Sequence, residues 1–477
     1  MQRLSGLDAA FLYAETASVH MHVGSALVFD PSTVEGGYSF ERMRQTVVAR
    51  LHEVPAFRQR LVMVPFDLHH PLWLNDPDFD IDYHLRRAAL PSPGGLRQLA
   101  DLAADILSRP LDRSRPLWEM WIVEGLDDDR VAAITKIHHA AIDGISGREI
   151  ATTMLDMNPE PDVTQPEEPF EPARVPSDLS VLAQAVAERI RQPRHLVETA
   201  YRTAKAAAKL GLRELQVRRP DGEEREGAPP PVPFTAPRTP FNTSITPHRR
   251  VEFLSLPLDD IKKVKNAFSV TFNDVVLAVC GGAVRGYLAE RDELPGQPLV
   301  AWVPISVRDR SGDGQRNAVS AMLTSLATDA EDPVERVQRI ASSARKGKRQ
   351  HVTIGATTLT DWTEFAAPAL FSRAARLYSS SGMADLHRPL YNVVVSNVPG
   401  PRRPLYFAGA KLDSFYAMGP VIDGGALNIT AMSYQDGVFF GLIACRETVP
   451  DLTQLAGHFE PTLAELREAA QAQETPA

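Results

Sequence analysis

The residues of this chain best suited to chemistry are two adjacent histidines at the end of an apolar run. His138 and His139 follow the apolar residues 131–137, and Asp143 and Gly144 come shortly after them. Histidine titrates near neutral pH, so it can remove a proton from an alcohol or an amine. The aspartate can fix the imidazole tautomer or brace the loop, and Gly144 lets the backbone turn where a Cβ would obstruct it. The spacing predicts a general base at a strand end.

Other kinds of site fit this sequence less well. Adjacent residues of an extended segment point to opposite faces, so the two histidines cannot readily hold one metal ion together. The chain has no Gly-x-Ser-x-Gly elbow, and its two cysteines, Cys280 and Cys445, are not near a histidine in sequence. No nucleotide-binding glycine motif is present. We therefore expect direct attack assisted by a histidine base, with no metal and no cofactor. A loop whose polar residues merely hold each other is the competing interpretation.

Composition and charge limit the function further. The chain has 477 residues and a net charge of −9, which argues against a general nucleic-acid binder. Two cysteines in apolar segments favour a reducing compartment. The N-terminus lacks the apolar core of a signal peptide, and the longest apolar stretch, Val275–Val284, is about half of the ~20 residues that cross a bilayer. We expect a cytoplasmic protein, for which peripheral attachment to a membrane stays open.

Strand-like and helix-like patterns alternate in both halves of the chain, which predicts an α/β protein. Ser5 and Asp8 form a capping box for a short opening helix. Further helices are expected at 40–54, 96–107, 145–155, 178–219, 258–268, 271–288, 333–346 and 452–470. Strands are expected at 21–29, 117–123, 131–137, 249–256, 299–307, 318–326, 392–396, 427–434 and 437–444.

A change of composition divides the chain into three parts. Residues 1–157 form a first lobe and residues 247–477 a second, separated by a proline-rich linker, 158–246. Within the linker, the helical pattern at 178–219 carries nine Lys or Arg residues against four acidic ones. This basic amphipathic helix either packs its apolar side on the lobes or contacts an anionic membrane or lipid-droplet surface.

Several short motifs, taken together and in order, resemble one family. The chain is similar to the bacterial wax ester synthase/diacylglycerol acyltransferase family, within the chloramphenicol acetyltransferase-like group that includes peptide condensation domains. Besides the histidine motif, the motifs are Leu4-Ser5-Gly6-Leu7-Asp8-Ala9, His20-Met21-His22-Val23-Gly24, Arg115-Pro116-Leu117-Trp118, Asn273-Asp274, Pro304-Ile305-Ser306-Val307-Arg308 and Asn397-Val398-Pro399-Gly400-Pro401. One departure is Arg316-Asn317, where the family often has Gly-Asn, and this puts the geometry of that turn in doubt.

The resemblance implies a fold, a reaction and its substrates. The fold is two chloramphenicol acetyltransferase-like lobes with mixed sheets and flanking helices, with an active-site tunnel between them. His139 is the general base and His138 a supporting residue, while Asp143 and Gly144 shape the loop. The reaction is transfer of a long-chain acyl group from fatty acyl-coenzyme A, a co-substrate, to diacylglycerol or a long-chain alcohol.

Three other motif residues each allow two roles, and Asp274 has one. Asn273 either donates a hydrogen bond into the tunnel or caps its helix, and Asp274 favours the helix dipole. Trp118 packs in the core or lines the tunnel. Arg308 pairs with Asp143 or holds a loop.

Two further functions compete with this reading. One is acyl transfer to another hydroxyl, such as that of a polyketide or a sugar. The other is a catalytically weak paralogue that binds lipid, against which the intact His139 and Asp143 argue.

Overall fold

The computed structural model describes residues 1–142, 153–160, 172–190, 231, 233–307, 318–354 and 368–474. Several sequence predictions lie outside these ranges. They are Asp143, Gly144 and Arg308, most of the helix expected at 145–155, and the part of the basic helix beyond residue 190.

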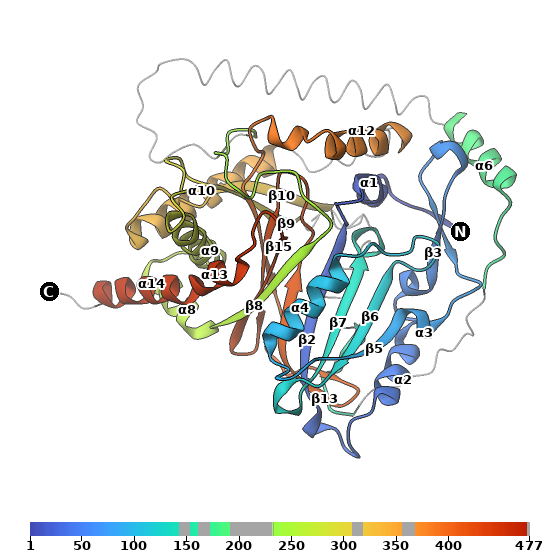
Figure 1. Ribbon diagram of the computed structural model, residues 1–477, viewed down its shortest axis with the longest axis horizontal. Helices are drawn as coiled ribbons and strands as arrows, with labels where there is room; N and C mark the ends of the chain where they lie inside the picture. The colour runs from blue at the N-terminus through green and yellow to red at the C-terminus, as the bar shows by residue number, and fades with distance from the viewer. Residues whose placement is uncertain are drawn as a thin grey trace.

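The first large sheet has six strands, in the order β12-β13-β2-β7-β6-β5 (Figure 1). Its pairs are antiparallel except for β5 and β6, which are parallel, so the sheet is mixed. The strands are β2 (His22–Asp30), β5 (Leu85–Ala89), β6 (Trp118–Glu124), β7 (Val131–His138), β12 (Tyr406–Phe407) and β13 (Ala410–Met418). A small sheet, β1-β4-β3, lies in the same half of the chain: β1 (Gln2–Arg3), β3 (Gln59–Val62) and β4 (Leu72–Asn75).

The second large sheet also has six strands, in the order β10-β9-β11-β14-β15-β8. It is mixed as well, because β11 pairs in parallel with both β9 and β14. Its strands are β8 (Arg249–Pro257), β9 (Val300–Val307), β10 (Ala318–Ser325), β11 (Val393–Pro399), β14 (Leu427–Tyr434) and β15 (Gly437–Cys445). The predicted α/β class with mixed sheets is confirmed.

Helices flank both sheets. Those in the first half of the chain are α1 (Gly6–Ala14), α2 (Phe40–Arg50), α3 (Ile81–His84), α4 (Leu96–Leu107) and α6 (Asp178–Ile190). Those in the second half are α8 (Leu258–Ala267), α9 (Phe272–Ala289), α10 (Pro333–Ile354), α12 (Pro368–Ser380), α13 (Leu452–Gly457) and α14 (Phe459–Glu474). Short 3-10 turns connect them: η1 (Pro31–Thr33), η2 (Pro55–Arg58), η3 (Pro65–Asp67), η4 (Asp127–Asp129), η5 (His139–Ile142) and η6 (Met383–Asp385).

Most of the expected elements are confirmed within a few residues. The amphipathic pattern at 96–107 gives α4 with the same bounds, and Ser5 caps α1 by accepting a hydrogen bond from the N–H of Asp8. The helix expected at 40–54 ends earlier, at Arg50, and the one expected at 452–470 is two helices, α13 and α14. Strands β1, β3, β4, β5, β12 and β13 and helices α3 and α12 were not predicted.

One strand crosses between the two halves of the chain. β13 comes from the range 247–477 but pairs antiparallel with β2, with Phe415 opposite Leu27. A division of the chain at residue 247 therefore does not coincide with the division between the sheets. The strand pattern of β13 carries no information on which sheet it joins, because β-strand pairing depends on contacts distant in sequence.

The surface between the lobes is itself part of the core. One buried apolar cluster joins α4, β2 and β7 to Val251 and Phe253 of β8 and to Tyr416 of β13. Phe253 and Tyr416 stack with ring centroids 4.6 Å apart. Burial of this much apolar surface holds the lobes in one arrangement.

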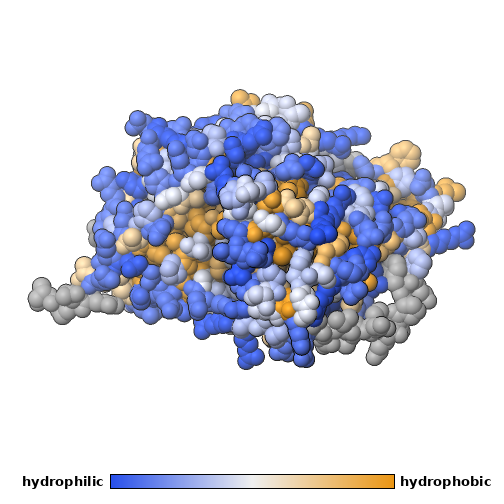
Figure 2. Space-filling view, turned by 60° about the horizontal axis from the view of Figure 1, so that its bottom comes forward, coloured by the Kyte–Doolittle hydropathy of each residue, from blue (hydrophilic) through white to orange (hydrophobic). Residues whose placement is uncertain are grey.

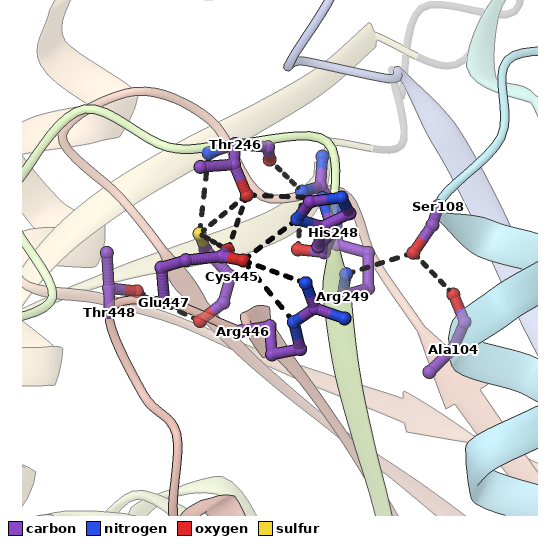
Figure 3. A network of polar contacts seen from close by, with 9 residues as sticks. All are labelled: Ala104, Ser108, Thr246, His248, Arg249, Cys445, Arg446, Glu447 and Thr448. Carbon is purple, nitrogen blue, oxygen red and sulfur yellow. Dashed lines mark hydrogen bonds and ion pairs between the residues drawn. The ribbon is translucent and has the colours of Figure 1, made fainter.

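A polar network closes one end of this contact (Figure 3). The backbone N–H of Arg249 donates to Oγ of Ser108, just after α4, and its guanidinium donates to the carbonyl of Ser18 at 2.5 Å. Burial lowers the pKa of Arg249 to about 10, so it stays cationic at neutral pH. On the far side of the network, Glu447 accepts hydrogen bonds from Thr246 and His248.

Within the described residues, no single helix has both the length and the hydropathy to span a bilayer. The pair α8 and α9 passes that test only jointly, and the two are bent by 105° at the break between them.

The close approach of β15 to β13 gives a test of the interlocked sheets. A Cβ on Gly441 would lie 2.2 Å from the carbonyl oxygen of Ala417, a backbone atom that cannot rotate away. We expect Gly441→Ala to lower the free energy of unfolding by about 3 kcal/mol, the upper range for overpacking. Urea denaturation measures it. Gly457→Ala, where no atom lies within 4 Å of the new Cβ, is the matched control. Equal effects of the two substitutions would contradict this packing.

Candidate active site

The two histidines lie where β7 ends and the η5 turn begins. His138 is the last residue of β7 and lies opposite His22 of β2. The backbone N–H of His139 donates to the carbonyl of Met21 at 2.8 Å, which extends the β2–β7 pairing by one bond. His138 is buried and His139 half-buried. Because adjacent residues at a strand end point to opposite faces, the two side chains lie in different surroundings.

A buried carboxylate that the sequence analysis did not single out organises this strand end. Glu15, the residue after α1, has Oε1 3.1 Å from Nε2 of His138 and 3.6 Å from Nε2 of His22. The same oxygen accepts the N–H of Met21, while Oε2 accepts from Arg113 at 2.5 Å. Burial raises the pKa of Glu15, but contact with His138 and attraction by Arg113 outweigh it, so the pKa lies well below its usual range. Glu15 is thus an anion at the centre of four positive or polar partners.

His138 has a polar neighbour at each ring nitrogen. Its Nδ1 accepts the backbone N–H of Ala140 at 3.0 Å, so the proton of the neutral ring is on Nε2, which faces Glu15. The tautomer-fixing role considered for Asp143 is therefore filled, for His138, by Glu15. With 1% of its side chain exposed, His138 braces the η5 turn and cannot easily meet a substrate. The auxiliary role assigned to His138 stays a prediction.

His139 has different surroundings. Its ring stacks on Phe11 of α1, with centroids 3.9 Å apart and planes inclined by 23°. Burial, and secondarily repulsion by His138, lower the pKa of His139 to about 4. The ring is therefore neutral at pH 7, the form that can accept a proton. Phe11 fixes the orientation of the ring without competing for its nitrogens.

Two of the remaining predicted residues, Trp118 and Asp274, have structural roles. Trp118 is buried between Phe57 and His84, at centroid distances of 4.6 and 4.8 Å, and its indole N–H donates to the carbonyl of Phe57. It is a core residue rather than part of a tunnel wall. Asp274 completes a capping box at the start of α9, accepting from the N–H and hydroxyl of Thr271.

Asn273 makes a contact that links two of the sequence motifs. Its Oδ1 accepts a hydrogen bond from Nδ2 of Asn397 at 3.3 Å, which ties the start of α9 to the end of β11. Thr271 caps the helix, so capping does not occupy the Asn273 side chain. Its proposed hydrogen bond into a tunnel stays a prediction.

Of the predicted site residues that the structure describes, none lines the surface pocket of about 510 Å³ on the second lobe, near Asp260, Asp436 and Arg467. Asp143, Gly144 and Arg308 lie outside the described residues, so their roles also stay predictions.

The residues that sequence reasoning missed are Glu15 and Phe11. Phe11 lies in α1, and Glu15 follows that helix directly. Both precede the His20-Met21-His22 motif, whose last residue begins the pairing with β7. A lone glutamate between two motifs carries no signal by itself. A signal would have come from asking which polar side chain pairs with the histidines buried at this strand end.

The fold and the paired histidines define a class of protein. The structure resembles the starter condensation domain of rhizomide synthetase (TM-score 0.53, 12% identity, covering 98% of this chain and 94% of that one). It also resembles the first condensation domain of the CDA synthetase (TM-score 0.54, 16% identity, 98% and 96%). At these identities the likeness shows the fold alone, which is that of the condensation-domain group.

More similar proteins narrow the class to a family. The catalytic-domain model of wax ester synthase/diacylglycerol acyltransferase matches residues 4–276, and the C-terminal domain model of that family matches residues 316–467. A Mycobacterium tuberculosis protein, named provisionally as a diacylglycerol O-acyltransferase, is 38% identical over 98% of this chain and 91% of its own length. A solved wax ester synthase/diacylglycerol acyltransferase from Marinobacter aquaeolei is 32% identical, with a TM-score of 0.68 over 98% and 100% of the two chains. This chain belongs to that family and is an acyltransferase.

Removal of Glu15 tests its role as a positioning residue. Glu15→Ala leaves Arg113 and the buried histidines without their anion, so we expect the free energy of unfolding to fall by about 3 kcal/mol. Glu15→Gln should lose less, because its amide oxygen still accepts the N–H of Met21. Urea denaturation measures both. The control is Asp101→Ala, which removes an exposed partner 3.7 Å from Arg97 and should cost less than about 1 kcal/mol. A Glu15→Ala loss no larger than the control would contradict a central role.

The lowered pKa of His139 predicts an unusual pH dependence. Because the free enzyme keeps this ring neutral down to about pH 4, kcat/KM should stay level between pH 8 and pH 6 and fall only toward pH 4. The free energy of unfolding depends on pH for the same reason. In the unfolded chain His139 binds a proton near pH 6.5, whereas in the folded protein it binds one only near pH 4. Stability therefore decreases as the pH falls from 6.5 toward 4. A pH profile of kcat/KM measures the first effect. An acid limb centred near 6.5 would be incompatible with these surroundings for the base.

Proposed function

We propose that this acyltransferase moves a long-chain acyl group from fatty acyl-coenzyme A to the free hydroxyl of diacylglycerol, which yields triacylglycerol. The observation that carries this proposal is the neutral, half-buried ring of His139, fixed on Phe11 beside the rigid His138–Glu15 pair. The provisional names of the Mycobacterium tuberculosis relatives support diacylglycerol as the acceptor. Acyl-coenzyme A is a co-substrate, and no step is assigned to a metal or a cofactor.

In the proposed reaction, a ring nitrogen of His139 takes the proton of the acceptor hydroxyl. The oxygen attacks the thioester carbonyl carbon and forms a new C–O bond, while the carbonyl electrons move to its oxygen. The tetrahedral intermediate then collapses, the C–S bond breaks, and the coenzyme A sulfur leaves with the proton held by His139. His139 ends neutral and can act as the base in the next catalytic cycle. Transfer is direct, because the base alone activates the acceptor.

A long-chain alcohol is the second candidate acceptor. The Marinobacter aquaeolei relative, matched over nearly the whole of both chains, is named for wax ester synthesis as well as for diacylglycerol acylation. Both acceptors present a primary or secondary hydroxyl on an apolar chain, so the same base serves either. Offering hexadecanol beside diacylglycerol in one assay measures the preference.

Substitution of His139 tests the base. With radiolabelled palmitoyl-coenzyme A and diacylglycerol, we expect His139→Ala to lower kcat by about 100- to 10,000-fold, the usual contribution of a positioned base. Hydrolysis without acceptor provides the background. Circular dichroism and urea denaturation of the same samples show whether the variant is folded. His138→Ala is the matched control. Its loss of kcat should be no larger than its loss of stability explains. Equal product from wild type and His139→Ala would refute the assignment, and loss confined to His138→Ala would exchange the roles of the two histidines.

A further inference from the structure

A third imidazole lies beside the end of β7, and the proposed reaction gives it no role. His22 begins β2 and lies opposite His138. Its ring is nearly parallel to that of His20, with centroids 5.5 Å apart, and meets the ring of His138 edge-on at 6.0 Å. On the face of the molecule in Figure 2, hydrophilic side chains cover most of the surface and apolar ones lie mainly between them. A polar side chain with 3% exposure departs from that division.

Neither ring nitrogen of His22 has a hydrogen-bond partner among the described residues. Nε2 lies 3.6 Å from Oε1 of Glu15, which is too far for a hydrogen bond. A buried polar group without a hydrogen bond lowers stability, and an apolar group of the same shape avoids that cost. The nitrogens of His22 therefore cost stability at this strand end, and the reason for an imidazole here lies elsewhere.

The contact between His22 and Glu15 has a direction. Burial, and after it repulsion by Lys136, holds the pKa of His22 well below its usual value, so the ring is neutral at pH 7. A neutral ring has one N–H, and the nearby carboxylate favours that proton on Nε2. Oε1 of Glu15 therefore lies between two N–H groups, at 3.1 Å from Nε2 of His138 and 3.6 Å from Nε2 of His22.

Arg113 attracts the same carboxylate from the other side. Its guanidinium donates to Oε2 at 2.5 Å, and its side chain is 38% exposed, against 3% for His22. The carboxylate of Glu15 is thus attracted outward by the arginine and inward by the imidazoles. Without the attraction of the His22 ring, the carboxylate would turn toward Arg113 and loosen its contact with His138.

Movement of Glu15 reaches the candidate base by two routes. Oε1 also accepts the N–H of Met21, whose carbonyl accepts the N–H of His139 at 2.8 Å. His138, the other partner, accepts on Nδ1 the N–H of Ala140, the residue after His139. Both routes end on the backbone at the base, so a displaced carboxylate displaces the imidazole of His139.

We propose that His22 is a positioning residue: its Nε2–H holds the Glu15 carboxylate against His138 and thereby fixes the place of His139. Its nitrogens lower stability and serve turnover, an exchange that is common at active sites. This role rests on the proposed function, because it is exerted through the general base. One of its consequences, the contact between Glu15 and His138, is measured without turnover.

Substitution of His22 by leucine is the test, because leucine has a similar volume and no polar atom. With palmitoyl-coenzyme A and diacylglycerol, we expect His22→Leu to lower kcat about 10- to 100-fold and to leave KM unchanged. Its midpoint of urea denaturation should equal or exceed that of wild type. His22→Gln places an amide N–H near the position of Nε2 and should recover most of the lost kcat.

His84→Leu is the matched control. His84 is also fully buried, and its Nε2 has no hydrogen-bond partner among the described residues. It lies at the end of α3, however, and its Nδ1 is 2.8 Å from the carbonyl oxygen of Trp118. Loss of that hydrogen bond should lower the urea midpoint and leave the kcat of the folded protein unchanged. The two substitutions therefore separate turnover from stability in opposite directions.

A double substitution shows whether His22 acts through Glu15. In the Glu15→Gln background, adding His22→Leu should lower kcat by less than about twofold further, because the carboxylate that His22 holds is already gone. Losses that multiply would show two independent residues and overturn the proposal. A His22→Leu protein that fails to fold or keeps full kcat would overturn it as well, and so would His22→Gln with no recovery.

The measurement without turnover is NMR of the Nε2 proton of His138, in protein that carries isotope-labelled histidine. A proton beside a buried carboxylate resonates far downfield, and His138→Gln identifies its signal by loss. We expect His22→Leu to move this signal upfield or to broaden it by exchange, and His84→Leu to leave it in place. An unchanged signal in His22→Leu overturns the proposal. A signal that responds as expected, in a protein that makes no triacylglycerol, contradicts only the proposed reaction.

Discussion

The contact between Glu15 and His138 is the interaction on which the candidate active site depends. A carboxylate and an imidazole are buried together at the end of β7, with Arg113 and His22 on either side. Either group alone in this position would be costly, because burial disfavours an unpaired polar group. Together they tie α1, β2 and β7 into one unit. The η5 turn, and hence the backbone of His139, takes its position from that unit.

The same unit explains why two neighbouring histidines have different properties. His138 accepts the N–H of Ala140 at Nδ1, and its Nε2 lies 3.1 Å from Oε1 of Glu15. His139 stacks on Phe11, and its surroundings hold it neutral. Adjacent residues on an extended segment face opposite ways, so the two imidazoles lie in different surroundings. A general base is most effective when its neutral form dominates at the working pH.

Local features of the fold could be predicted from the sequence. The Ser5–Asp8 cap, helix α4 and the strand β7 follow from capping chemistry and hydrophobic period alone. The pairing of β13 with β2 could not be predicted, because a strand pattern does not specify its partner. In the candidate active site, too, local features could be predicted and long-range contacts could not. His138 and His139 stand out by type and spacing, whereas Glu15 becomes important only when folding brings it to a strand that follows it by more than a hundred residues. Burial of Trp118 likewise depends on Phe57 and His84, which no local pattern connects to it.

We propose that the imidazole of His139 accepts the proton of the acceptor hydroxyl. Chemical rescue tests it most directly, with added imidazole supplied to His139→Gly and to His138→Gly during acylation of diacylglycerol. We expect imidazole to restore turnover to His139→Gly, with a pH dependence that follows the free imidazole, and to do nothing for His138→Gly. Rescue of His138→Gly alone, or full activity of His139→Gly without imidazole, would contradict it.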